Sequence, residues 1–137
     1  MPDLHPVYAE LRSRLSRHAA GFRESSNVTD ANAPASRKER APDDATYVLL
    51  GAPTERYPDG QLFAMVKLGK RYVSYHLMCL YLEPALLEGM SPGLGRRMQG
   101  KSCFNFTKVD EPLFDELEAL TARGKALYAE RGLLLPD

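Results

Sequence analysis

The chain has 137 residues, of which 44% are hydrophobic and 26% are charged, and its formal net charge is zero. These values are typical of a globular domain, so they exclude a disordered chain and a membrane-embedded one. A domain of this length buries about two thirds of the surface that its unfolded chain exposes, which is enough for one ordinary core. We therefore expect a single domain over residues 1–137.

Targeting signals and disulfide patterns are also missing from the sequence. No apolar run approaches the roughly 18 residues that span a bilayer, and residues 1–5 lack the basic start and apolar middle of a signal peptide. We expect a soluble cytoplasmic protein with no membrane partner. Cys79 and Cys103 show no metal-ligand spacing, so we interpret both as buried, reduced thiols and predict no metal site.

The first predicted element is an amphipathic helix over residues 3–19. Its apolar side chains recur at intervals of three or four, and Asp3 is the expected N-cap. Its charged side chains are expected to face solvent: Glu10, Arg12, Arg14 and Arg17. Residues 23–46 contain no aromatic side chain and are rich in Ser, Asn, Asp and Pro, so they predict a long polar loop.

Residues 47–106 are predicted to form a sheet. The expected strands cover residues 47–50, 62–68, 72–81 and 101–106. The dipeptide Gly69-Lys70 suits a tight hairpin turn between the second and third of these. Side chains alternate along a strand, so Phe63, Met65 and Lys67 are expected on one face and Leu62, Ala64 and Val66 on the other.

The remaining elements are helical. Residues 83–98 contain Pro84 and Pro92 at the starts of short apolar segments, which predicts a short helical insertion in the sheet. Residues 110–131 return to helical spacing after Asp110 as cap, with a stop or bend expected near Gly124. The whole pattern predicts an α+β fold: a twisted antiparallel β-sheet of about four to six strands with N- and C-terminal helices packed on it.

One segment matches a nucleotide-binding pattern letter for letter. Residues 95–102 read GRRMQGKS, which fits the phosphate-binding loop GxxxxGK[ST]. That loop needs a strand before the glycines and a helix after the Ser, so that amide groups and the helix N-terminus converge on phosphate. Here a helical turn precedes the pattern and an alternating, strand-like run follows Ser102. We therefore interpret the segment as a structural turn and expect neither ATP nor GTP as a partner.

Charge is distributed unevenly along the chain. Residues 67–108 carry seven basic and two acidic side chains, whereas residues 109–137 are mostly acidic. The basic stretch predicts a sheet edge for an anionic ligand. The candidate ligand-binding residues are Lys67, Tyr75, His76, Arg97 and Lys101. The zero net charge argues against nucleic acid as a partner.

His76 is the one histidine in the predicted sheet. A histidine can act as a general base or metal ligand, but no Ser/His/Asp spacing, paired carboxylates or HExxH pattern accompanies it. A hydrogen-bonded sheet residue is therefore the simpler interpretation, and we name no catalytic residue. A catalytic role would need a carboxylate or thiol within about 3 Å of the ring.

Residues 72–78, YVSYHLM, and 98–106, MQGKSCFNF, resemble the YdhG-like family of bacterial proteins, a domain of unknown function. The resemblance covers residues 46–124 and is dense over 71–106. It implies a frataxin-like sheet with flanking helices, in which the Gly-Lys-Ser step belongs to the entry of a strand. Where the family pattern has proline, this chain has Cys79, which restores a backbone donor and predicts a more regular strand.

These observations lead to three functional hypotheses. We expect a non-enzymatic binding or accessory protein whose basic sheet edge holds a small anionic ligand or partner. The first alternative, implied by the frataxin-like resemblance, is an iron chaperone for iron-sulfur or haem assembly. On the first helix only Asp3 and Glu10 are acidic, so that role would fall to residues of the last helix such as Asp115 and Glu116. The second alternative is an enzyme that uses His76 as general base. No cofactor is predicted, with iron as the alternative.

Overall fold

The computed structural model describes residues 3–26, 45–58 and 60–135. Its strands are β1 (Arg23–Ser26), β2 (Ala45–Leu50), β3 (Leu62–Leu68), β4 (Val73–Leu77), β5 (Met98–Gln99) and β6 (Cys103–Phe106). Its helices are α1 (His5–Ser16), α2 (Cys79–Leu82), the 3-10 helix η2 (Pro84–Leu87), α3 (Pro92–Gly95) and α4 (Glu111–Glu130).

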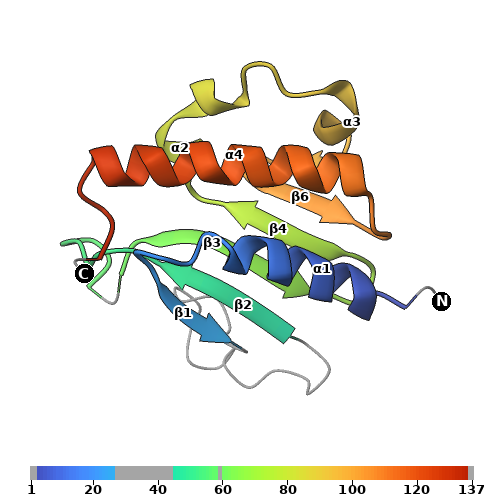
Figure 1. Ribbon diagram of the computed structural model, residues 1–137, viewed down its shortest axis with the longest axis horizontal. Helices are drawn as coiled ribbons and strands as arrows, with labels where there is room; N and C mark the ends of the chain where they lie inside the picture. Colours follow the sequence, from blue (N-terminus) through green and yellow to red (C-terminus); the bar gives the residue numbers. More distant parts are fainter. Residues whose placement is uncertain (1–2, 27–44, 59, 136–137) are drawn as a thin grey trace.

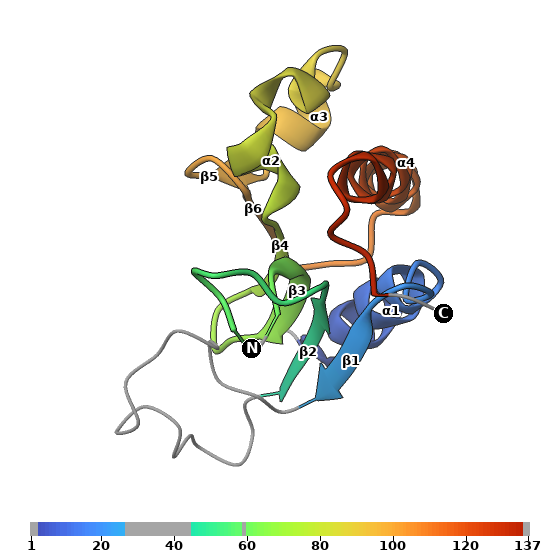
Figure 2. The ribbon, with the colours of Figure 1, turned by 90° about the vertical axis from the view of Figure 1, so that its left-hand side faces the viewer.

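The strands form one sheet in which every neighbouring pair is antiparallel, in the order β1-β2-β3-β4-β6-β5. The two long helices, α1 and α4, lie side by side on the same face of this sheet (Figures 1 and 2). The α+β architecture predicted from the sequence is therefore confirmed, including the helices packed from both ends of the chain. Within the described part of the chain, no helix is long and apolar enough to span a bilayer.

The core lies between the sheet and the two helices. Val66, Tyr75 and Phe104 point into it from three adjacent strands, and each is at most 1% exposed. Leu11 and Leu117 meet them from α1 and α4. Burying one such side chain contributes roughly 1.5–3 kcal/mol, so this layer supplies most of the stabilisation that holds the helices to the sheet.

A β-bulge changes the expected alternation in β3. Leu50 pairs with Leu62 and Leu49 with Ala64, so Phe63 has no cross-strand partner in β2. Its ring stacks on Phe22 with centroids 4.4 Å apart and is completely buried. The expectation that Phe63 shares a face with Met65 and Lys67 was therefore wrong. The extra residue turns the ring into the core.

Three element boundaries also differ from the expectation. The predicted polar loop over 23–46 contains β1 at its start and the first residues of β2 at its end, while residues 27–44 lie outside the described part of the chain. The strand expected over 72–81 ends at Leu77, because Met78 has helical dihedrals (φ −64°, ψ −27°) and α2 follows. Cys79 therefore begins a helix instead of extending a strand. The predicted insertion over 83–98 accordingly starts early, at α2, and ends at β5.

The helix ends follow the capping rules in one case and not in the other. The Asp110 side chain accepts a hydrogen bond from the Leu113 N–H at 3.3 Å, which confirms it as the N-cap of α4. The N-cap of α1 is Leu4, whereas Asp3 lies one residue earlier and accepts from the His5 N–H. Asp3 as the cap was therefore wrong. The expected stop or bend near Gly124 was wrong too, since α4 runs unbroken to Glu130.

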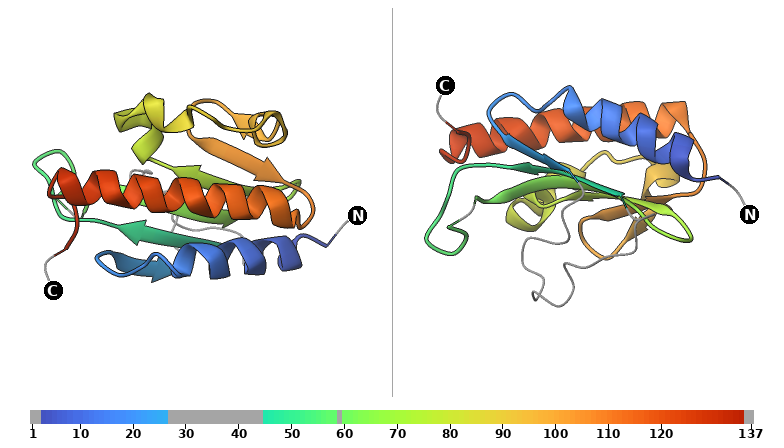
Figure 3. Two further views of the ribbon diagram at one scale, coloured as in Figure 1. Left: turned by 45° about the horizontal axis from the view of Figure 1, so that its top comes forward. Right: turned by 90° about the horizontal axis from the view of Figure 1, so that it is seen from below.

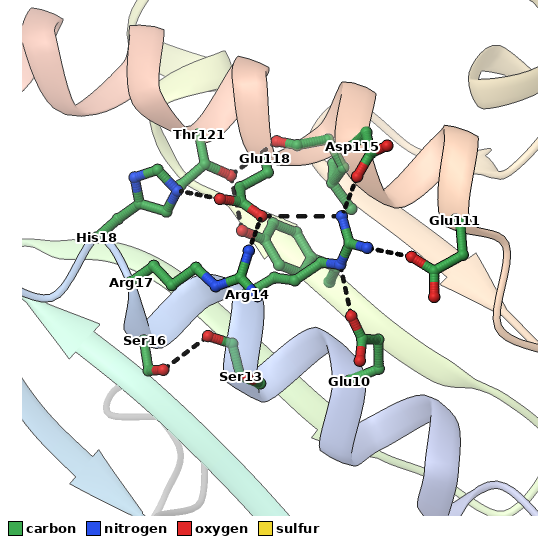
Figure 4. Close-up of polar contacts among 12 residues, drawn as sticks. Glu10, Ser13, Arg14, Ser16, Arg17, His18, Glu111, Asp115, Glu118 and Thr121 are labelled. Carbon is green, nitrogen blue, oxygen red and sulfur yellow. Dashed lines mark hydrogen bonds and ion pairs between the residues drawn. The ribbon is translucent and has the colours of Figure 1, made fainter.

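Arg14 departs most from its expected place on the solvent side of the first helix. Only 7% of the residue is exposed, because α4 covers it. Its guanidinium contacts Glu10 on its own helix and Glu111 and Asp115 on α4 (Figure 4). These carboxylates compensate the buried charge and hold the pKa of Arg14 above its ordinary value despite desolvation. The contacts fasten the first helix to the last.

Candidate functional site

The face of the sheet opposite α1 and α4 carries the half-buried polar side chains. In one row across three strands, Met65 pairs with His76 and His76 with Cys103. In the next row, Lys67 pairs with Ser74 and Ser74 with Asn105. Their sequence neighbours Val66, Tyr75 and Phe104 point into the core, so alternation directs these six side chains the other way. We call this surface the open face; Figure 3 shows both long helices on the other side.

His76 is held in the open face by two side chains at the start of β6. Its Nδ1 lies 3.0 Å from Ser102 Oγ and 3.0 Å from Cys103 Sγ. Burial raises the pKa of the Cys103 thiol, an effect that the Ser102 hydroxyl partly offsets. The thiol is therefore protonated at neutral pH and can donate to Nδ1. The expectation of a hydrogen-bonded sheet histidine is confirmed.

The other thiol is structural. Cys79 is fully buried at the start of α2, and burial raises its pKa to about 12. Both cysteines are free. The expectation of two reduced thiols is confirmed, although Cys103 is only half-buried.

A small depression of about 300 Å³ lies at the turn between β3 and β4. Its lining consists of Lys67, Gly69, Lys70, Arg71, Tyr72 and Ser74, and we call it the basic pocket. The Gly69 N–H donates to the Tyr72 carbonyl at 3.1 Å and closes the hairpin. The expected hairpin is therefore confirmed, but its loop covers residues 69–72 and not the two residues Gly69-Lys70 alone. Three cationic side chains and no acidic one line this described surface.

A larger depression of about 760 Å³ lies further along the same face, and we call it the groove. Its apolar lining comes from β3, the segment after β4 and α2: Leu62, Met65, Met78, Tyr81 and Leu82. His76 lines it as well, and the segment between β2 and β3 contributes Arg56 and Tyr57. The guanidinium of Arg56 lies 5.6 Å from the centroid of the Tyr57 ring, within range of a cation–π contact.

The five candidate residues do not form one cluster. Lys67 and His76 share the open face, on neighbouring strands. Tyr75 lies on the opposite side, fully buried, with its hydroxyl 2.6 Å from Thr121 Oγ1 on α4, and burial raises its pKa. Arg97 and Lys101 flank β5 at the sheet edge, where the Arg97 carbonyl accepts from the Asn105 N–H at 2.8 Å.

Sequence reasoning missed the residues that lie beside His76 and Lys67. Ser102 and Cys103 come 26 and 27 residues after His76, so only the register of β4 with β6 brings them together. Lys70 and Arg71 stand in the hairpin loop next to Lys67. The sequence does carry a signal for them, since both lie within four residues of Lys67 in the basic stretch 67–108.

The phosphate-loop pattern has the context expected of a structural turn. The short helix α3 precedes it, and β6 begins at Cys103, immediately after the pattern ends. Without a helix after Ser102, no helix N-terminus points at a phosphate there. Ser102 is instead 1% exposed and hydrogen-bonds to His76.

The two acidic side chains of α4 that were named as possible iron ligands, Asp115 and Glu116, already have partners. Asp115 Oδ1 accepts from Arg14 at 2.5 Å. Glu116 accepts from the Ser91 N–H at 2.7 Å and from the Ser91 hydroxyl at 2.6 Å, which ties the start of α3 to α4. Among the residues that the structure describes, no group of three or more His, Cys, Asp or Glu side chains is placed to hold a metal ion.

Comparison with known proteins identifies no relative: no protein-family model, curated protein or solved structure matches this chain.

Proposed function

We propose that the protein is a non-enzymatic binding protein that holds a small anionic molecule in the basic pocket. The observation that carries the proposal is the convergence of Lys67, Lys70 and Arg71 on one depression without an acidic side chain in its described lining. Lys70 and Arg71 are adjacent like charges on a short hairpin, so an anion placed beside them relieves their repulsion.

The chemistry of the lining favours a carboxylate or a phosphoryl group. An arginine guanidinium binds either group in a bidentate fashion, and lysines add point charges. Tyr72 and Ser74 also line this depression, and each carries a hydroxyl group that can form a hydrogen bond. Because β3 and β4 are central strands of the sheet, this lining has a rigid support.

Binding of inorganic phosphate and of short carboxylates, followed by calorimetry at low ionic strength, tests the proposal. Arg71→Gln and Lys70→Gln each remove one exposed charge and are expected to weaken binding about tenfold, the value of one charge-assisted hydrogen bond. Lys101→Gln is the matched control, because it removes an exposed cation outside the pocket. Equal effects of all three substitutions, or no saturable binding to the unchanged protein, would refute a specific anion site.

An enzyme that uses His76 as general base is the second candidate. The 3.0 Å separation of His76 Nδ1 from Cys103 Sγ favours it, since a thiol within hydrogen-bond reach is the partner such a mechanism needs. The raised pKa of Cys103 opposes it. The rate of Cys103 alkylation by iodoacetamide at pH 7 decides: an activated thiol reacts faster than a free one and slows in His76→Gln, whereas an inactive thiol reacts more slowly in both proteins.

The iron-chaperone alternative has less support, because Asp115 and Glu116 already make the contacts described above. Anaerobic calorimetry with Fe²⁺, repeated on Asp115→Asn and Glu116→Gln, tests it directly. Membership of the YdhG-like family is supported by one feature that the resemblance implies, the entry into β6 directly after the Gly-Lys-Ser step.

A further inference from the structure

We infer that the bound anion carries an apolar or aromatic body that lies in the groove, so that the ligand is an amphipathic organic anion. The inference rests on the proposed function and adds the class of ligand to it. It follows from three features of the open face: the position of the groove relative to the basic pocket, the chemistry of its walls, and its charge.

The groove and the basic pocket lie on the same face at successive positions of the same two strands. On β3, Met65 lines the groove and Lys67 lines the pocket, while on β4 His76 lines the groove and Ser74 the pocket. Two residues along a strand span about 7 Å, which is the length of one aromatic ring with its substituent. One small molecule can therefore place its anionic group in the basic pocket, beside Lys70 and Arg71, and its body over Met65.

The walls of the groove suit an apolar body. Met65 and Met78 are unbranched, polarizable side chains that adapt to the shape of a ligand. Tyr81 is 54% exposed, and its ring centroid lies 6.3 Å from that of His76. In the described chain, three large hydrophobic residues are exposed: Tyr81 lines the groove and Tyr72 the basic pocket, and only Val109 lies elsewhere. Two of these three exposed side chains therefore line the proposed site, and each offers an aromatic ring to a ligand.

The volume of the groove and the charges that line both depressions narrow the class of ligand further. A volume of about 760 Å³ falls in the range of small-molecule sites, roughly 300–1,000 Å³. The one fully charged side chain in the described lining of the groove is Arg56, and those of the pocket are also cationic. A cationic or neutral ligand would gain nothing from these charges, so the complementary ligand is an anion at one end or both.

Three probes separate the body of the ligand from its charge. Anilinonaphthalene sulfonate carries an aromatic body and an anionic group, N-phenylnaphthylamine carries nearly the same body without the charge, and inorganic sulfate carries the charge without the body. The first two probes are measured by fluorescence titration of the full chain and the third by calorimetry. Anilinonaphthalene sulfonate is expected to bind with a stoichiometry of one and at least about tenfold more tightly than either of the other two probes.

Substitutions at two exposed residues, Tyr81 and Arg71, test the two parts of the site separately. Tyr81→Ala is expected to weaken the combined probe and the neutral probe about fivefold and to leave sulfate unchanged, whereas Arg71→Gln weakens the combined probe and sulfate and leaves the neutral probe unchanged. Val109→Ala is the matched control, because it truncates an exposed hydrophobic residue away from both depressions. Circular dichroism confirms that each variant is folded.

The outcomes distinguish this inference from the proposed function. If sulfate binds and responds to Arg71→Gln but the combined probe gains nothing over sulfate, the anion site stands and the inference falls. If Tyr81→Ala and Val109→Ala affect the combined probe equally, the inference also falls. If no probe responds to Arg71→Gln, the proposed function itself is refuted. If sedimentation shows a dimer that Tyr81→Ala disrupts, a second copy of the chain covers the groove, and the inference is overturned.

Discussion

Gly124 is the position where the packing of α4 on the sheet can be tested most sharply. A Cβ atom added at this buried helical glycine would lie 2.4 Å from Cys79 Sγ and 3.4 Å from Phe63 Cε1. The first distance is far inside van der Waals contact, and Cys79 is fully buried at the start of α2, so it cannot move away into solvent. Gly124→Ala therefore forces either the sulfur or the helix to shift.

The size of the effect follows from two opposing terms. Overpacking a core costs about 1–3 kcal/mol, and we take the upper end because the contact is so close. Ala is better than Gly inside a helix by about 1 kcal/mol. The free energy of unfolding is thus expected to fall by about 2 kcal/mol, which lowers the Tm of a domain of this length by roughly 6–8 °C.

Urea unfolding of four proteins isolates the contact: the unchanged chain, Gly124→Ala, Cys79→Ala and the double variant. Cys79→Ala removes the sulfur, so in that background Gly124→Ala is expected to be neutral or to stabilise by up to about 1 kcal/mol. The coupling energy is then about 2–3 kcal/mol, within the range found for residues in contact. Ala122→Gly, at an exposed position of α4, measures the propensity term alone. A stabilising Gly124→Ala in the unchanged chain, or a coupling energy near zero, would refute this account of the packing.

Three further predictions concern buried polar groups. Arg14→Met leaves the carboxylates around it without their cation and is expected to lower the free energy of unfolding by about 2 kcal/mol. The loss is smaller than for a fully buried pair, because most of these carboxylates are exposed. In urea unfolding, added salt should restore part of the lost stability, because it screens the repulsion between the carboxylates. Burial raises the pKa values of Tyr75 and Cys79, so the native state favours their protonated forms. Stability is therefore expected to fall by up to roughly 1.4 kcal/mol per pH unit for each group, above about pH 9 for Cys79 and above about pH 10 for Tyr75, where the unfolded side chains ionise. Tyr75→Phe and Cys79→Ala should each flatten this decline in urea titrations at pH 8–11. Glu116→Gln weakens the attachment of Ser91 to α4 and is expected to cost about 1 kcal/mol, visible as faster amide exchange in α3 while the rest of the sheet is unchanged.

Those parts of the fold that depend on local periodicity could be predicted from the sequence. The spacing of apolar residues located α1 and α4, and the alternation in 101–106 located β6. The strand predicted over 72–81 was wrong beyond Leu77, because the apolar run 77–81 fits a buried strand and a short helix equally well. In the structure, the backbone becomes helical at Met78, and α2 follows from Cys79.

Features that depend on distant partners could not be predicted in this way. Phe63 enters the core because of a bulge against β2, and nothing within 62–68 signals it. Arg14 appears solvent-facing until α4 supplies carboxylates about a hundred residues later. His76 finds its thiol partner only through the register of β4 with β6. In each case the residue can be identified in the sequence, but its environment depends on which strands or helices pair with each other.

The two faces of the sheet differ in composition, and this difference supports the proposal that places binding on the open face. On the covered face, the large apolar side chains of the central strands pack against the two long helices. On the open face, the polar residues pair with one another: Ser74 donates to Asn105, and Ser102 bonds to His76. These bonds fix the floor without help from a ligand. The methionines, tyrosines and cations of the same face stand around that floor at the two depressions. A rigid polar floor with adaptable apolar and cationic walls is the arrangement expected of a site that recognises small organic anions.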